Sequence, residues 1–395
     1  MIAEHQQLHM DVNYHAVLEV CLREILSFIK PSADDVLKRQ NAIKEIAVAI
    51  QSDRSLMEAG AAVKPFGSYI SDLYTKWGDL DISIDLAQSK PSPDDRQLKI
   101  NVLHKIMRAL QRIGVANNVE FVRARVPLLV YTSKCCKISC DISINNHAGY
   151  VKSCILRWIS NTDKRFCEFV LVIKEWAKAQ HINDPKTGTL NSYSLCLLII
   201  FHFQTCTPAI LPPLKELYEG NIVDGVKGGN TLRHIEASYS ANFESYRSKI
   251  SSRRNQSSLS ELLTSFFDKF SGLDTLASDY VICTYTGKWE PINNSKIRWM
   301  RKFQTLLIED PFEKNENAAR AVGASGLTEI SRVFKAMCRK LSTRLLLADR
   351  NSLLSNLLGP EIRSKFDAGR QQIHDRFGTQ IDSSRLPQCY FVTQK

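Results

Sequence analysis

The spacing of apolar positions changes along the chain, and the change separates an α/β part from a helical part. Apolar residues at helical spacing predict a helix over residues 15–30, which ends at Pro31, and a second helix that begins after Ser32. Short β-branched runs then predict strands, with a helix over Arg96–Gly114 among them. The predicted strands are Ala62–Phe66, Asp81–Asp85, Val119–Val122, Leu128–Tyr131 and Ile138–Ile144. This mixed order predicts a small α/β unit over residues 46–148.

From residue 150 onward the pattern is mostly helical. The segments with helical periodicity are 152–160, 164–182, 192–205, 258–270, 327–346 and 360–376. The stretch 245–260 is rich in Ser and Arg and is typical of a surface connection. The weak pattern after residue 377 predicts a loosely attached tail.

Composition and charge narrow the class of protein. Apolar residues make up 44% of the chain and charged residues 24%, which is typical of a soluble globular protein. The longest apolar run, Leu195–Phe203, is about half the length that spans a bilayer, and the N-terminus has no signal-peptide pattern. The cysteines are scattered without a zinc-like spacing, which favours free thiols in a reducing compartment. We therefore expect no membrane partner and a cytoplasmic location, with the nucleus as an alternative.

The net charge of +11 favours a polyanionic partner, and nucleic acid is the leading candidate. The segment 295–304 adds weight, because it interleaves cations with aromatic rings, a pattern that suits RNA. A partly buried strand with a basic outer face would show the same pattern. The residues that we predict to contact RNA are Arg298, Trp299, Arg301 and Lys302.

Three carboxylates carry the candidate chemistry. Asp79 and Asp81 are two residues apart, so on a strand both side chains point to one face, and Asp141 follows a later strand-like run. Adjacent carboxylates repel each other unless a cation neutralises them, and a third acid completes an oxygen site that suits Mg²⁺. The preceding Gly67 and Ser68 supply a turn and a hydroxyl for a phosphate chain. A lone D-x-D pair is also a common surface feature, and we interpret Asp85 in that way.

These motifs resemble those of template-independent nucleotidyltransferases of the DNA polymerase β superfamily. More closely, the chain is similar to plant terminal uridylyltransferases that tail small RNAs lacking a 3′-terminal methyl group. The resemblance covers roughly residues 15–345. The matching motifs read PFGS, WGDLDIS, SCDISI, LVIKEWAKAQHIND, TGTLNSYSL and IEDPFE.

The resemblance implies an α+β fold with a cleft between a small mixed-sheet catalytic domain and a larger helical PAP-associated domain. We expect N-terminal helices over 1–45 that pack with the helical domain, a catalytic domain over 46–148, a helical nucleotide-recognition domain over 149–376 and a tail over 377–395. Asp79, Asp81 and Asp141 would be the catalytic metal ligands for Mg²⁺ or Mn²⁺. The implied nucleotide-binding residues are Gly67, Ser68, Lys174, Lys178, Ser192, Tyr193, Asp310, Glu313, Glu316 and Arg320.

Several of these positions have an ordinary structural interpretation as well. Lys174 and Lys178 share a helical face, which fits either a triphosphate or a solvated surface. Ser192 fits either an anion contact or a helix cap. Two positions depart from the family pattern: many relatives carry a His where this chain has Glu316, and an Asn where it has Lys152. Both departures bear on the choice between UTP and ATP.

The implied activity is addition of uridine from UTP to the 3′ end of unmethylated small RNAs, which promotes their decay, as in microRNA turnover. A small-RNA effector such as an Argonaute is the implied protein partner, and we expect a monomer. Three alternatives stay open: a poly(A) polymerase that uses ATP, a catalytically inactive RNA-binding scaffold, and a metal-dependent synthase for small molecules. The three aspartates argue against a scaffold, and the positive charge argues against a small-molecule enzyme.

Overall fold

The computed structural model describes residues 2–87, 95–123, 126–218, 229–250, 254–293, 304–313, 315–343 and 350–376. Its strands are β1 (Ala62–Phe66), β2 (Leu80–Asp85), β3 (Ala116–Val122), β4 (Leu128–Ser133), β5 (Ser139–Ile144), β6 (Tyr280–Cys283) and β7 (Lys288–Pro291). Its α-helices are α1 (Ile2–Ile29), α2 (Ala33–Gln51), α3 (Arg54–Glu58), α4 (Gly67–Ser71), α5 (Asp95–Arg112), α6 (His147–Thr162), α7 (Lys164–Ala179), α8 (Ser192–Thr205), α10 (Gly229–Lys249), α11 (Leu259–Phe270), α12 (Leu273–Asp279), α13 (Ala324–Ser342), α14 (Arg350–Leu357) and α15 (Pro360–Arg376).

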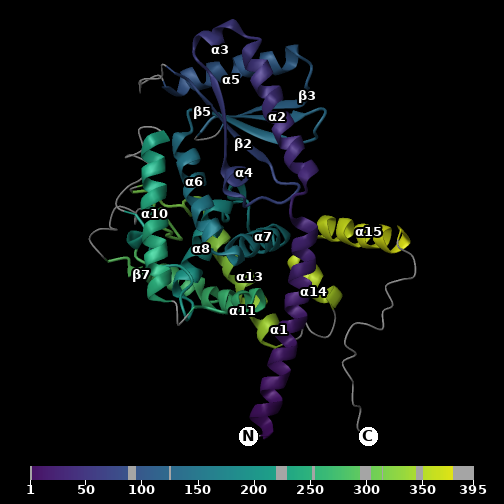
Figure 1. Ribbon diagram of the computed structural model, residues 1–395, viewed down its shortest axis with the longest axis vertical. Helices are drawn as coiled ribbons and strands as arrows, with labels where there is room; N and C mark the ends of the chain where they lie inside the picture. The colour runs from purple at the N-terminus through teal and green to yellow at the C-terminus, as the bar shows by residue number, and fades with distance from the viewer. Residues whose placement is uncertain are drawn as a thin grey trace.

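A five-stranded mixed sheet forms the centre of the smaller unit. Its strand order is β1-β2-β5-β4-β3, and β2 and β5 are the parallel pair among antiparallel neighbours. Figure 1 shows this sheet at the top of the molecule with α2, α3 and α5, above a mostly helical body. The predicted α+β fold class is confirmed.

The two faces of the sheet have different roles. Leu80, Ile82 and Ile84 of β2 are buried in a core that also contains residues of α2 and α5, so these helices cover one face. Because side chains alternate along a strand, Asp81 of β2 and Asp141 of β5 belong to the opposite face. That face is turned toward the helical body.

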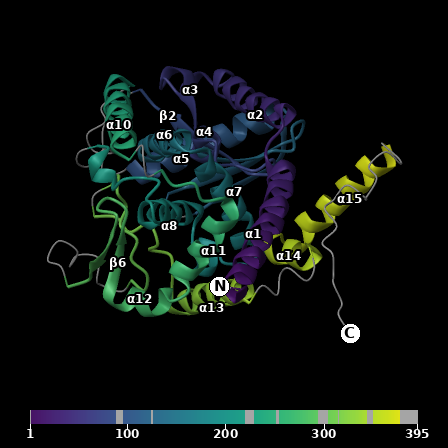
Figure 2. The ribbon, with the colours of Figure 1, turned by 60° about the horizontal axis from the view of Figure 1, so that its bottom comes forward.

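The helical body has its own core, and α1 belongs to it. Buried residues of α1 join those of α6, α7, α8, α11 and α13 in one continuous apolar cluster. Figures 1 and 2 show α1 running beside α11 and α14, although these helices are more than 200 residues apart in sequence. The N-terminal helix and the C-terminal half of the chain therefore build one structural unit.

The second helix, α2, was expected to pack with the helical domain, but it packs mainly on the sheet. Its C-terminal half, from Ala42 to Ile50, is buried in the core of the sheet unit rather than in the helical body. We therefore propose a domain boundary near residue 31, between α1 and α2, in place of the expected boundary at residue 45. The capping box of α2, in which Ser32 and Asp35 bond each other's backbone N–H, fixes where that unit begins.

Sequence periodicity missed α10, α12, α14 and the β6–β7 hairpin. The stretch 245–260, expected to be a connection, starts inside α10, which ends at Lys249. The tail beyond residue 376 lies outside the described residues. Among the helices that the structure describes, none is both long and apolar enough to cross a membrane.

Candidate active site

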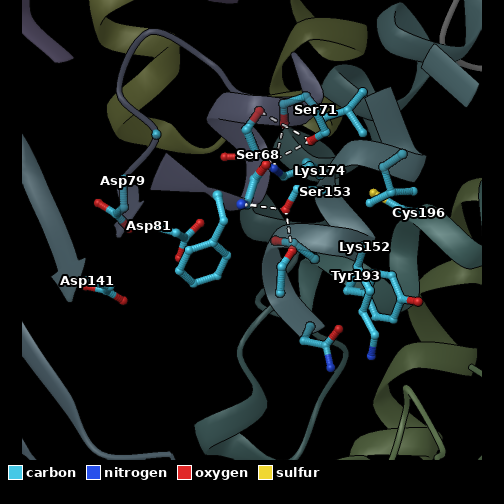
Figure 3. Close-up of a pocket in the computed structure, with 18 of the residues that line it drawn as sticks. Ser68, Ser71, Asp79, Asp81, Asp141, Lys152, Ser153, Lys174, Tyr193 and Cys196 are labelled. Carbon is cyan, nitrogen blue, oxygen red and sulfur yellow. Dashed lines mark hydrogen bonds between the residues drawn. The ribbon is translucent and has the colours of Figure 1, made fainter. Parts of the chain in front are cut away.

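A cavity of about 600 Å³ lies where the two units meet. Its walls come from the end of the sheet, from α4, and from α6, α7 and α8 of the helical body. This size is in the range of cavities that hold a small ligand such as a nucleotide. Figure 3 shows Asp79, Asp81 and Asp141 on one side of the pocket and Lys152 and Tyr193 on the other, with Ser153 between them.

The sheet register brings two of the aspartates together. Asp81 and Asp141 are direct partners across the parallel β2–β5 pair. Asp79 lies one residue before β2 begins, so it comes from the loop that leads into the strand rather than from the strand itself. All three line the cavity. Sixty residues separate Asp81 from Asp141 in sequence, and the parallel pairing places them side by side.

Burial and crowding make the ionised forms of these carboxylates unfavourable. Burial, together with the neighbouring carboxylate of Asp141, raises the pKa of Asp81 to about 7. Burial is also the main cause of the raised pKa of Asp79, and of the raised pKa of Asp141, to which the carboxylate of Asp79 adds. A cation held among the three carboxylates would stabilise their ionised forms.

The donor chemistry fits magnesium. Carboxylate oxygens are the hard ligands that Mg²⁺ prefers. Among the residues that the structure describes, no three acidic, histidine or cysteine side chains are already drawn together into a complete metal site. In sites that act on nucleotides Mg²⁺ commonly takes one or two carboxylates and fills its other positions with water and substrate phosphates. An open group of aspartates is compatible with that kind of binding.

The turn at Gly67 packs directly against Asp81. Gly67 has φ +68°, and a Cβ atom placed on it would lie 1.9 Å from Oδ2 of Asp81. Its N–H donates to Oγ of Ser153 on α6 at 2.7 Å, and Ser153 in turn donates to the carbonyl of Gly149 at 2.6 Å. The backbone N–H of Ser68 lies close enough to the carboxylate of Asp81 to oppose the rise of its pKa. The position therefore requires glycine both for its φ angle and for the space beside Asp81.

Two buried cations hold the loop that leads to Asp79. Arg39 of α2 is fully buried, and its Nη2 donates to the carbonyl oxygens of Lys76 and Gly78 at 3.2 and 2.6 Å. Nζ of Lys174 on α7 donates to the carbonyl of Leu73 at 2.9 Å. Helices of both units thus fix the loop from which Asp79 projects. No sequence pattern singles out Arg39, because a single Arg in a helix is ordinarily a surface residue.

The two lysines of α7 both line the cavity but differ in their surroundings. Lys174 is buried, and burial lowers its pKa. Lys178 is about half exposed and lies 3.5 Å from the carboxylate of Glu175, which also accepts a hydrogen bond from Thr75. Their predicted contact with a triphosphate stays a prediction, and the cavity lining is consistent with it.

The start of α8 supplies two further predicted residues. Asn191 is the N-cap, so the hydroxyl of Ser192 is not used for capping and instead donates to Asn183 at 3.2 Å. The hydroxyl of Tyr193 donates to Oδ1 of Asp310 at 2.9 Å. Ser192, Tyr193 and Asn183 all line the cavity. Sequence reasoning did not single out Asn183, although it lies within one of the matching motifs.

The predicted residues after position 309 are not among the described residues that line the cavity. Asp310 and Glu313 both form ion pairs with Lys152, and Glu316 pairs with Arg320 at 2.5 Å. Among the described residues, the cavity lining includes Lys152 but none of these four. Arg298, Trp299, Arg301 and Lys302, predicted to contact RNA, lie outside the described residues.

Comparison with known proteins agrees with this geometry. Residues 18–161 match the family model "Poly(A) RNA polymerase, mitochondrial-like, central palm domain". Protein HESO1 of Arabidopsis thaliana is 45% identical over 353 residues, which are 88% of this chain and 67% of that protein.

Two solved structures share the fold. A cytoplasmic RNA terminal U-transferase superposes with a TM-score of 0.66 at 26% identity, over 87% of this chain and 98% of that one. The Cid1 poly(U) polymerase bound to MgGTP superposes with a TM-score of 0.62 at 23% identity, over 82% of this chain and 94% of that one. The chain therefore belongs to the terminal nucleotidyltransferase family that includes HESO1 of Arabidopsis thaliana.

Proposed function

We propose that this enzyme adds uridine from UTP to the 3′ end of RNA without a template. The observation that carries the proposal is the pairing of Asp81 with Asp141 on the cleft face of the sheet, opposite a nucleotide-sized cavity. The relative that is 26% identical is an RNA terminal U-transferase, which supports uridine as the added nucleotide and RNA as the acceptor.

In the proposed reaction, the 3′-oxygen of the RNA attacks the α-phosphorus of UTP. The bond from the α-phosphorus to the bridging oxygen breaks, pyrophosphate leaves, and the hydroxyl proton is lost to solvent. We propose that Asp79, Asp81 and Asp141 hold Mg²⁺, as the MgGTP complex of Cid1 suggests, and that Mn²⁺ can replace it. The bound ions would lower the pKa of the attacking hydroxyl and stabilise the negative charge of the leaving pyrophosphate.

The other cavity residues bind and orient the nucleotide. Lys174 and Lys178 lie on the cavity wall formed by α7 and would contact the phosphates, with Ser192 at the start of α8 beside them. Tyr193 would stack on the base, because an aromatic ring offers a π-face to any base. Since the protein itself holds the incoming nucleotide, no template strand is needed.

With a short unmethylated RNA and each nucleoside triphosphate supplied separately, we expect UTP to be incorporated at least about tenfold faster than ATP, CTP or GTP. The measurement is the single-nucleotide extension rate on a denaturing gel. The control is the Asp141→Ala protein, which should extend nothing. Preferential use of ATP would replace the proposal with a poly(A) polymerase, the function named by the family model. Failure to use any triphosphate would favour an RNA-binding scaffold.

We propose further that the acceptors are small RNAs with an unmethylated 3′ end, that tailing promotes their decay, and that an Argonaute-like effector presents them. A 2′-O-methyl group on the terminal nucleotide should crowd the neighbouring 3′-hydroxyl, where in-line attack tolerates little displacement. We expect methylation to slow addition at least about tenfold while leaving the RNA dissociation constant nearly unchanged. Equal extension rates for methylated and unmethylated ends would contradict the small-RNA assignment.

A further inference from the structure

Lys152 of α6 lines the cavity and departs from the family pattern. Its side chain is 18% exposed, and its Nζ lies 2.5 Å from Oδ2 of Asp310 and 2.7 Å from Oε2 of Glu313. The same Nζ lies 5.2 Å from the ring centroid of Tyr193. Figure 3 shows Lys152 and Tyr193 side by side, away from the three aspartates. A base stacked on Tyr193 would therefore lie close to the ammonium of Lys152.

Asp310 is poorly placed to contact a base itself. Its side chain is only 3% exposed. Oδ1 already accepts hydrogen bonds from the Tyr193 hydroxyl and from the backbone N–H groups of Phe312 and Glu313, and Oδ2 accepts one from Lys152. A carboxylate with four protein donors and almost no exposed surface orients its neighbours rather than a ligand.

Residue 316 does not supply a donor to the base either. Glu316 pairs with Arg320 at 2.5 Å within its own segment, and its backbone carbonyl accepts from the N–H of Asp310 at 3.0 Å. A carboxylate also has no proton to donate when it is ionised. Among the described residues that line the cavity, Lys152 is thus the charged group beside Tyr193.

We propose that Lys152 determines base specificity by donating a hydrogen bond to O4 of the incoming uracil, and that Asp310 and Glu313 are positioning residues that act through it. This inference rests on the proposed uridylyl transfer. An ammonium has three N–H donors; the two carboxylates engage two of them and leave one for the nucleotide.

The chemistry of an ammonium favours uracil over bases that carry an amino group. It can donate but cannot accept, so it matches O4 of uracil, whereas cytosine and adenine carry at the corresponding position an amino group that finds no acceptor. Discrimination of this kind is strong, because a site built for a hydrogen bond loses it entirely with the wrong partner.

The test compares wild-type enzyme with Lys152→Met, which keeps an unbranched side chain only one atom shorter and removes the donors. For each protein, kcat/KM is measured with UTP, CTP, 2-thio-UTP, 4-thio-UTP and 2′-deoxy-UTP. We expect Lys152→Met to lower kcat/KM for UTP by about ten- to a hundredfold, the range for one hydrogen bond to a charged group. The wild-type preference for UTP over CTP should fall with it.

The thio analogues identify the atom that accepts the hydrogen bond, because sulfur is a weaker acceptor than oxygen. Wild-type enzyme should use 4-thio-UTP, but not 2-thio-UTP, less well than UTP, and Lys152→Met should use UTP and 4-thio-UTP equally. The penalty against 2′-deoxy-UTP should be the same in both proteins. The assignment would be overturned if Lys152→Met still used 4-thio-UTP less well than UTP. It would also be overturned if Lys152→Met used 2′-deoxy-UTP as well as UTP, which would indicate a sugar contact.

Matched variants separate specificity from general damage. Lys164→Met removes an exposed lysine at the start of α7 and should leave every ratio unchanged. Glu313→Gln keeps the shape of the side chain and weakens its hold on Lys152, so its UTP to CTP ratio should lie between those of wild-type and Lys152→Met. If Glu313→Gln matched wild-type, the positioning role would be wrong. If wild-type enzyme added no uridine, the proposed function itself would fail, whereas active enzyme with an unaltered Lys152→Met ratio would contradict only this inference.

Discussion

Replacing Asp81 by alanine is expected to lower the rate of nucleotide addition at least about a thousandfold, because loss of a metal ligand removes several kcal/mol of charge stabilisation from the transition state. Asp81 is the aspartate that contacts the Gly67 turn, the Ser68 N–H and the partner strand that carries Asp141. The measurement is a single-turnover extension assay with saturating UTP and Mg²⁺. A variant that retains a rate near wild-type would show that Asp81 does not serve the chemistry.

Asp85 provides a matched control on the same strand. It has the same parity as Asp81, but its carboxylate pairs with Lys64 at 2.8 Å, and it is not among the described residues that line the cavity. Asp85→Ala should therefore retain nearly full activity. An equal loss in both variants would indicate damage to β2 rather than removal of a ligand.

Replacing Asp81 by asparagine should raise the stability of the fold, although it should lower activity. The folded-state pKa of Asp81, about 7, is above its ordinary value of 3.8, so the folded state binds the proton more tightly than the unfolded state. Ionised Asp81 consequently destabilises the fold, and the effect grows as the pH rises from about 4 to about 7. In EDTA, Asp81→Asn should melt above wild-type at pH 7 and with a smaller difference near pH 4. A lower melting temperature at pH 7 would contradict the assigned shift.

Replacing Gly67 by alanine is expected to lower activity at least about a hundredfold, because displacing a reacting group by about 1 Å can cost that much. The added Cβ would lie 1.9 Å from Oδ2 of Asp81, so the carboxylate must move. The rate of UTP incorporation at saturating substrate measures the effect.

The Gly114→Ala variant measures the effect of the left-handed backbone conformation without a steric clash. Its φ of +71° nearly equals the +68° of Gly67, but a Cβ atom there meets nothing within 4 Å. Both alanine variants should lose about 1 kcal/mol of stability from the left-handed conformation, whereas only Gly67→Ala should lose activity. Comparable activity in the two variants would show that the contact between Gly67 and Asp81 is unimportant.

The sequence by itself indicated the strands of the five-stranded sheet and the candidate catalytic aspartates. Short strand-like runs placed β1 at Ala62–Phe66, as observed, and placed β2 within one residue. The period of a strand also predicted that Asp79 and Asp81 share one face, although Asp79 lies in the loop before β2. Local spacing carries this information, since a strand repeats every two residues and a helix about every 3.6.

Tertiary structure decided which distant side chains meet. The parallel register of β2 and β5 made Asp81 and Asp141 neighbours, and the packing of α2 on the sheet brought Arg39 to the loop before Asp79. Lys152, noted from the sequence only as a departure from the family pattern, proved to be the partner of Asp310 and Glu313, more than 150 residues away. No local pattern encodes such pairs, because the free energy that selects them comes from packing and charge pairing between elements that meet only in the folded chain.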